Sequence, residues 1–250
     1  MRLLVTRPAS DAAKLAKRLR GLGHSVHIAP LIQIHYMQNI VWPDKPPMAF
    51  AITSANGVRA LIKLEKQFQL KYKKRPQNIT AFAVGPTTAK AARLGGWQDV
   101  FTSEGSVPAL IETICNQYRA KGVPSSDASR INDAAETLWH ISGDITAGDL
   151  VGGLQDCGLP ARRISLYEAI AAETMPQRIM QKLSSYDGVL LYSKRSARIF
   201  TNLTKSQSIK PIAYCLSQPI ADEVRALGYE TKIASTPTDR AMANIIGRAV

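Results

Sequence analysis

An internal repeat limits the folds open to this chain more than any other feature of its sequence. The stretch AVGPTTAKAARLGGW (83–97) matches CLSQPIADEVRALGY (215–229) at one constant offset. Upstream, AITSANGV (51–58) resembles LLYSKRSA (190–197), and the N-terminal strand–helix–strand resembles a later segment that runs from Leu138 to Leu166. Self-similarity at this scale is the signature of a duplicated structural unit. The sequence therefore predicts two similar lobes with a cleft between them.

Short apolar runs alternate with helix-period segments along the whole chain. Met48 to Thr53, for example, reads as a strand, and Ala55 to Phe68 reads as the helix that follows it. Strands that are nearly all apolar and alternate with helices predict parallel sheets covered on both faces, an α/β fold. Leu31 to Tyr36 differs, because its period-two alternation is typical of a connecting ribbon. Gly122 to Asp133, rich in Ser and Asp, is expected to be a mobile surface loop.

The residues just past the predicted strands are mostly hydroxyl groups, glycines and cations. In parallel sheets, ligands bind beyond the carboxyl ends of the strands. This position holds no paired carboxylates, no His beside a nucleophile and no Cys, so it suits the binding of a polyanion better than acid–base or nucleophilic chemistry. The candidate binding residues are Thr6, Arg7, Ser54, Gly85, Thr88, Gly143, Ser193, Lys194, Arg195, Ser196 and Ser217.

The turn at Gly85 and Pro86 illustrates two interpretations of such a strand end. A helix that opens at Thr87 and Thr88 leaves backbone N–H groups unpaired beside two hydroxyls, which is an arrangement that binds anions. A simple helix cap explains the same residues. Lys194 and Arg195 are likewise either partners for carboxylates or solvated cations at a helix start.

The charge balance agrees with an anionic ligand. The 250 residues include 32 basic and 19 acidic side chains, a formal net charge of +13. A field of this size attracts nucleic acid, anionic lipid or a multiply charged small molecule. The only dense basic cluster, from Lys71 to Arg75, lacks an accompanying nucleic-acid motif and is interpreted as a solvated helix end.

Cysteine and histidine usage gives no metal signature. Cys115, Cys157 and Cys215 show no CxxC spacing and cannot all pair with one another, and the four histidines are scattered. No membrane-spanning segment or signal sequence is evident. We therefore expect a cytoplasmic protein with no metal.

Seven motifs in order and register resemble the uroporphyrinogen-III synthase family over nearly the whole chain. They are RLLVTRP, AITSANGV, AVGPTTA followed by LGG, the Ser142-Gly143 strand end, LYEA at 166–169, LLYSKRSA and CLSQPIADEVRALGY. The resemblance implies an enzyme, a cyclising hydro-lyase that converts hydroxymethylbilane into uroporphyrinogen III with inversion of ring D and loss of water. It also implies a small-molecule polycarboxylate substrate and a reaction without metal or organic cofactor. A monomer is expected because the sequence has no obvious apolar surface helix, and the lack of nucleic-acid motifs and of membrane-spanning segments predicts no nucleic-acid or membrane partner. Transient contact with the preceding pathway enzyme is left open.

The family's fold is two flavodoxin-like lobes joined by a two-stranded antiparallel ladder. Carried over to this chain, residues 1–36 and 173–250 would form the first lobe and residues 37–172 the second. The ladder would comprise about 31–37 and 165–170.

The resemblance also implies roles for single residues. Tyr167 matches the family's ladder tyrosine, which is thought to help the hydroxyl group leave; a purely structural role at the hinge is the alternative. Thr6, Arg7, Ser54, Gly85, Thr88, Ser193 and Ser196 match other family positions. Ser217 stands where many members have a glycine, and Pro219 and Ile220 replace the two threonines that follow.

Two other functions remain open from the sequence. A two-lobed, non-catalytic protein that binds a polyanion would explain the lack of acid–base groups equally well. A nucleotide- or flavin-using enzyme is weakened by the lack of GxGxxG after a strand and of GxxxxGK[ST].

Overall fold

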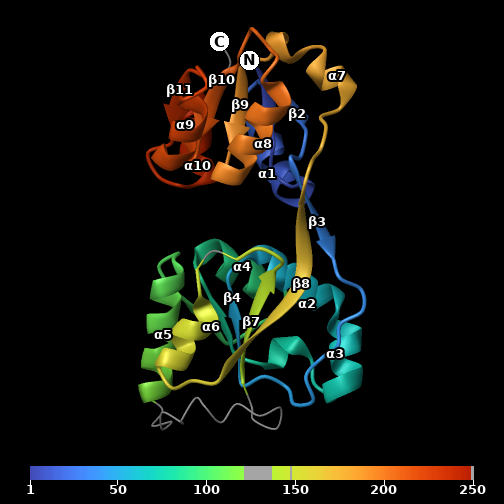
Figure 1. The fold of residues 1–250 in the computed structure, drawn as a ribbon, viewed down its shortest axis with the longest axis vertical. Helices are drawn as coiled ribbons and strands as arrows, with labels where there is room; N and C mark the ends of the chain where they lie inside the picture. The colour runs from blue at the N-terminus through green and yellow to red at the C-terminus, as the bar shows by residue number, and fades with distance from the viewer. Residues whose placement is uncertain (121–136, 147, 249–250) are drawn as a thin grey trace. The chain divides into compact units, whose positions relative to one another are not determined.

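The computed structural model describes residues 1–120, 137–146 and 148–248. The predicted surface loop at 122–133 lies outside these residues. Internal contacts divide the chain into two compact units (Figure 1). Unit 1 combines Met1–Gln33 with Ile170–Val250, and unit 2 is Ile34–Ala169. The chain therefore leaves unit 1 once and returns to it once, within three residues of the boundaries expected at 36/37 and 172/173.

Unit 1 is built on a five-stranded parallel sheet with the order β11-β10-β9-β1-β2. Its strands are β1 (Arg2–Val5), β2 (Ser25–Ile28), β9 (Gly188–Leu191), β10 (Ile212–Cys215) and β11 (Thr231–Ile233). The three central strands are buried almost throughout, as expected for strands covered on both faces.

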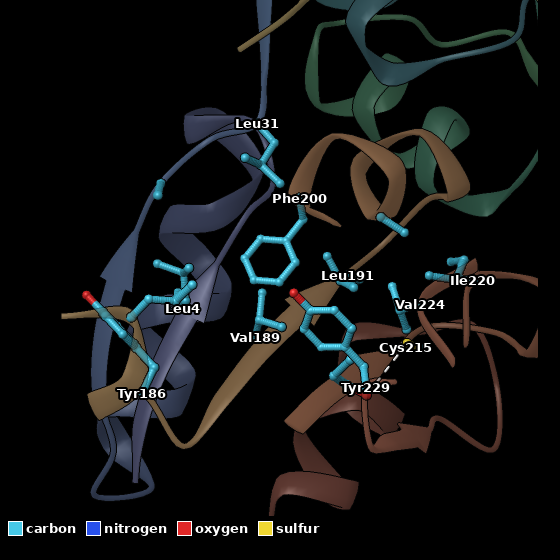
Figure 2. Packing of buried hydrophobic residues seen from close by; sticks show 14 of the residues in the cluster. Leu4, Leu31, Tyr186, Val189, Leu191, Phe200, Cys215, Ile220, Val224 and Tyr229 are labelled. Carbon is cyan, nitrogen blue, oxygen red and sulfur yellow. Dashed lines mark hydrogen bonds between the residues drawn. The ribbon is translucent and has the colours of Figure 1, made fainter. Parts of the chain in front are cut away.

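Helices cover both faces of this sheet. They are α1 (Ala9–Gly21), α7 (Gln177–Met180), α8 (Lys194–Thr204), α9 (Gln218–Arg225), α10 (Asp239–Ile246) and the 3₁₀ turn η3 (Leu183–Ser185). One core contains residues of α1 and α10, and the opposite core contains residues of α7, α8 and α9. Figure 2 shows this second core, in which the ring of Phe200 points toward Val189 and Tyr229. The buried Tyr229 hydroxyl is 2.7 Å from Thr204 Oγ1, so its polar atom is satisfied.

Unit 2 contains a six-stranded sheet with the order β3-β8-β7-β4-β5-β6. Its strands are β3 (Ile32–Tyr36), β4 (Ala49–Ile52), β5 (Ala81–Ala83), β6 (Val100–Thr102), β7 (Leu138–Gly143) and β8 (Ala161–Ala171). The five strands from β8 to β6 are parallel. Their order repeats that of unit 1 if β8, β7, β4, β5 and β6 are matched with β2, β1, β9, β10 and β11. The duplication expected from the sequence is thus present in both sheets.

Two helical layers cover the sheet of unit 2. The helices are α2 (Ala55–Lys63), α3 (Glu65–Tyr72), α4 (Pro86–Leu94), α5 (Val107–Ala120) and α6 (Leu150–Asp156), with the 3₁₀ turn η1 (Pro76–Asn78). α2, α3 and α4 share a core with an aromatic group around Trp139 and Phe68. α5 and α6 pack side by side on the opposite face (Figure 1).

The single helix predicted from Ala55 to Phe68 is two helices. Leu64 lies between α2 and α3 and is the cap residue of both. Its φ of −94° and ψ of 5° lie outside the helical region. Beyond the break, Phe68 packs against Trp139 and Phe50. Apolar spacing alone missed it, because Leu64 and Phe68 are both buried and keep the helical period across the break.

The strands β3 and β8 are hydrogen-bonded neighbours, and the chain passes between the units within them. Met37 N donates to Leu166 O, and Ala172 N donates to Leu31 O. The sum of the paired residue numbers is the same for both bonds, which is the signature of antiparallel pairing. β3 alternates between partly buried and exposed residues, consistent with its period-two pattern.

Cys115 of α5 and Cys157 at the end of α6 form a disulfide, with their Cα atoms 6.3 Å apart. Their spacing in the sequence gave no sign of this pair. The third cysteine, Cys215, is buried, and burial raises the pKa of its thiol to about 12, so it is protonated and unreactive at neutral pH. Over the described part of the chain, no helix is both long and apolar enough to cross a membrane.

Candidate functional site

The predicted site residues occur at the carboxyl ends of the strands in both sheets. In unit 2, Ser54 follows β4, Gly85 follows β5, Gly143 ends β7, and Tyr167 lies in β8. In unit 1, Thr6 and Arg7 follow β1, Ser193 follows β9, and Ser217 follows β10. The two sets belong to different units.

A pocket of about 530 Å³ lies at this end of the unit 2 sheet. It is lined by polar groups from four strand ends and by the beginning of α5. The described lining residues are Thr53, Ser54, Val84, Gly105, Ser106, Val107, Pro108, His140, Ile145, Thr146, Gly148 and Tyr167. Two predicted residues, Ser54 and Tyr167, are brought together here. None of these described lining residues is Lys, Arg, Asp or Glu, so the pocket offers hydroxyl and imidazole groups rather than charges.

A bulge in β8 places Tyr167 at the pocket. Ser142 pairs with Ser165, but the next residue, Gly143, pairs with Tyr167, so β8 contains one extra residue at this point. A bulge of this kind turns the following side chains and strengthens the local twist. Asp144 N donates to Tyr167 O over 2.9 Å and Arg163 Nη2 donates to Gly143 O over 2.6 Å, which together fix the backbone on either side of the ring.

The phenol of Tyr167 is largely buried, with 7% of the residue exposed. Burial raises its pKa above the usual value and the charge of Asp144 adds to this, while hydrogen bonds with Ser54 and with the Gly143 backbone lower it. The raised pKa keeps the hydroxyl protonated at neutral pH, so Tyr167 can donate a hydrogen bond or a proton. Ser54 also caps α2, since its Oγ accepts from Asn56 N over 3.1 Å.

Gly143 has a steric reason to lack a side chain. A β-carbon at this position would lie 2.5 Å from Cε2 of Tyr167 and 2.8 Å from its Cζ. These distances are far below van der Waals contact, so the Tyr167 ring occupies the space that any other residue would fill.

Gly85 and Thr88 lie at the start of α4. Gly85 is the N-cap residue in an extended conformation, and a β-carbon there would lie 3.2 Å from Gly105 Cα. Thr88 is only 5% exposed and is not among the described residues that line the pocket. The binding of an anion by this turn therefore stays a prediction.

In unit 1, Thr6 and Arg7 already have partners. Thr6 is 1% exposed, and its Oγ1 donates to Leu190 O over 2.7 Å, which ties β1 to β9. Arg7 Nη1 donates to Asp239 Oδ1 over 2.7 Å, and the guanidinium stacks over the Tyr192 ring at 4.4 Å. A substrate carboxylate would therefore compete with Asp239 for Arg7.

The second-copy serines begin two helices. Ser193 caps α8, and its Oγ accepts from Ser196 N over 3.0 Å while Ser196 Oγ accepts from Ser193 N over 3.1 Å. This reciprocal capping box satisfies two backbone donors at the helix start. Ser217 is the N-cap residue of α9 without a side-chain cap bond. Lys194 is exposed and Arg195 is half-buried at the start of α8.

Sequence reasoning missed the contribution of His140 to the pocket, although it placed Thr53 at a strand end where a ligand was expected. Thr53 Oγ1 lies 3.2 Å from His140 Nε2. A histidine within an apolar strand is normally interpreted as a core residue, and only a comparison with the matching strand of the other repeat would have singled it out. Among the described residues, no group of His, Cys, Asp and Glu side chains is arranged to hold a metal ion.

Comparisons with known proteins agree with this architecture. A family model described as uroporphyrinogen-III synthase HemD matches residues 13–244. The structure is similar to the uroporphyrinogen-III synthetase of Helicobacter pylori, with 16% identity, a TM-score of 0.62 and coverage of 98% of both chains. It is also similar to a mutant uroporphyrinogen III synthase of Thermus thermophilus, with 13% identity, a TM-score of 0.59 and coverage of 98% of this chain and 96% of that one. At these identities the structural likeness establishes a shared fold. The comparison with curated proteins returned no match.

Proposed function

Because the chain belongs to the uroporphyrinogen-III synthase family, we propose that it acts as a cyclising hydro-lyase that converts hydroxymethylbilane into uroporphyrinogen III. The family places the chain in tetrapyrrole biosynthesis with a polypyrrole substrate, so the non-catalytic binding protein considered from the sequence is not favoured. The reaction would remove the terminal hydroxyl group as water and close the ring with inversion of ring D.

The observation that supports this reaction most directly is the protonated phenol of Tyr167 in a pocket without charged side chains among its described lining residues. Loss of a hydroxyl group requires a proton, since hydroxide is a poor leaving group. Tyr167 would donate this proton, or a strong hydrogen bond, as the carbon–oxygen bond breaks. Ser54 would hold the phenol in place and stabilise the charge that develops on its oxygen.

The rest of the site would bind and orient the substrate. Loss of the hydroxyl leaves a reactive cation, and the enzyme must fold the chain so that the uninverted closure is out of reach. Holding the reacting groups in the productive geometry lowers the activation barrier and so raises the reaction rate. The acidic arms of the substrate would be attracted by the net charge of +13 and held at the strand ends by backbone N–H and hydroxyl groups.

The remaining parts of the proposal concern the protein's state in the cell. We propose a monomer in the cytoplasm that needs no metal or organic cofactor, with transient contact with the preceding pathway enzyme as an open option. A reducing cytoplasm would keep Cys115 and Cys157 as thiols, so a count of free thiols in rapidly quenched cells would test this localisation.

An isomer-resolved product assay tests the function. Purified protein with hydroxymethylbilane should give the type III isomer without added metal or cofactor, while only type I product at the spontaneous rate would contradict the proposal. Tyr167→Phe should lower kcat by about a hundredfold, within the usual range for a general acid. Tyr214→Phe is a matched control, because Tyr214 is also buried but belongs to the core of unit 1.

A further inference from the structure

His140 lies in the central strand β7, where its neighbours across the sheet are Ala51 in β4 and Arg163 in β8. Only 3% of the residue is exposed, and the part that reaches the surface lines the pocket beside Thr53 and Tyr167. Buried polar groups are destabilising unless they are hydrogen-bonded, so a histidine at this position needs an explanation.

The repeat shows that the fold itself does not require this histidine. β7 corresponds to β1 and β4 to β9, and the registers agree: Ala49 pairs with Leu138 as Gly188 pairs with Leu3. Two residues further along, His140 beside Ala51 therefore corresponds to Val5 beside Leu190. Val5 is fully buried in the apolar core of unit 1. The same strand position is thus apolar in one copy and an imidazole only in the copy that carries Tyr167.

The imidazole of His140 forms a hydrogen bond with the Thr53 hydroxyl, which lines the pocket. His140 Nε2 lies 3.2 Å from Thr53 Oγ1, and either group donates, according to the tautomer of the ring. Thr53 is followed directly by Ser54, the hydrogen-bond partner of Tyr167. His140 therefore contacts the residue next to Ser54 and lines the same pocket as the proposed proton donor, Tyr167.

The ring is uncharged at neutral pH. Burial, followed by the charge of Arg163, lowers the pKa of His140 to about 4, and the charge of Asp149 opposes this only in part. A neutral imidazole has one N–H group and one lone pair, so it can orient a hydroxyl without adding a charge. A positive charge here would instead attract an acidic arm of the substrate into the pocket.

We infer that His140 is a positioning residue for the ring-closing reaction: its ring orients the Thr53 hydroxyl toward the substrate in the pocket that contains Tyr167. The pocket thereby receives the uncharged hydroxymethyl group of the polypyrrole, while the carboxylate arms lie outside this uncharged lining. This inference rests on the proposed function, and its test must separate the two.

The test measures steady-state kinetics of the type III product for four variants. His140→Leu keeps the volume and removes the hydrogen bond, and His140→Gln keeps an amide that can bond to Thr53. Thr53→Val removes the hydroxyl, and the fourth variant combines it with His140→Leu. We expect kcat to fall about tenfold in His140→Leu and Thr53→Val with KM within twofold, no further fall in the double variant, and substantial recovery in His140→Gln. Thermal melting identifies any variant that is simply unfolded.

A second readout does not depend on turnover. Thr53→Val should shift the imidazole ¹⁵N resonances of His140 and leave those of His24, His27 and His35 in place.

The outcomes are distinct. Wild-type kcat in His140→Leu, or losses that multiply in the double variant, would overturn the inference while leaving the proposed function standing. Unshifted His140 resonances would also overturn it. A wild-type protein that gives only the type I isomer would instead remove the proposed function.

Discussion

The ring of Tyr167 lies directly over the backbone of Gly143. A β-carbon added to Gly143 would lie only 2.5 Å from Cε2 of this ring. This contact joins the end of β7 to the bulge in β8 and sets the direction of the phenol. The glycine and the tyrosine therefore form one structural unit, although 24 positions separate them in the chain.

Gly143→Ala should move the Tyr167 ring away from Ser54. We expect kcat to fall at least tenfold, together with a loss of about 1–3 kcal/mol of unfolding free energy from overpacking. Product assays and urea unfolding measure the two effects. Gly21→Ala is the control, since a β-carbon there meets no atom within 4 Å and the position lies at the end of α1. A Gly143→Ala enzyme with full activity would show that the ring need not be held in this place.

The lowered pKa of His140 should make the free energy of unfolding depend on pH. Its folded-state pKa of about 4 lies below the usual value of 6.5, so between these values the unfolded chain binds more protons and stability falls as the pH is lowered. The full effect is about 3 kcal/mol by pH 4 and is absent above pH 7. Urea unfolding at pH 7 and pH 4.5 should therefore give a smaller difference for His140→Leu than for the wild type. Equal differences would place His140 in a more solvated setting than the structure shows.

Asp239 should limit what Arg7 can bind. Asp239→Asn removes the nearer of two carboxylates beside the guanidinium, the other being Asp11 at 3.8 Å, and should make Arg7 more available to a substrate carboxylate. Because the pair is partly exposed, we expect a stability loss of at most about 1 kcal/mol, smaller at high salt. If Arg7 contacts the substrate, KM should fall in Asp239→Asn and rise in Arg7→Ala. Unchanged KM in both variants would assign the pair to structure alone.

Ser193 offers a way to separate capping from binding. Ser193→Ala removes the cap of α8 and should destabilise the protein by about 1 kcal/mol. Ser193→Asp keeps a good capping oxygen but adds a negative charge at the strand end. If acidic arms bind there, Ser193→Asp should retain its melting temperature and raise KM several-fold. A KM equal to that of the wild type would remove this helix start from the binding surface.

Much of the architecture could be predicted from the sequence, because it depends on the internal repeat and on the alternation of apolar runs with helix-period segments. The repeat predicted two α/β units, and apolar runs located the strands whose ends carry Ser54 and Gly143, whereas Tyr167 was singled out only by the family resemblance. The break at Leu64 could not be predicted, since the buried Leu64 and Phe68 keep the helical period across it.

The chemistry at the site was harder to read. The contact of Arg7 with Asp239 joins residues at opposite ends of the chain, and no sequence spacing encodes it. The bulge that turns Tyr167 toward Gly143 depends on the pairing of β7 with β8. His140 was not predicted as a site residue, because a single histidine among apolar residues resembles a core position. Only a comparison with Val5, the equivalent position in the other sheet, singles it out.

The crossing of the chain through β3 and β8 has a consequence for synthesis on the ribosome. β1 and β2 are made before unit 2, yet β1 must pair with β9, which emerges only after all of unit 2. Unit 2 is continuous in sequence and can fold as soon as it is complete, while β1 in the first 33 residues still lacks its neighbour β9. The basic side chains within these residues, among them Arg2, Arg7, Lys14, Lys17, Arg18 and Arg20, would keep this part of the nascent chain hydrated and slow its association with other chains.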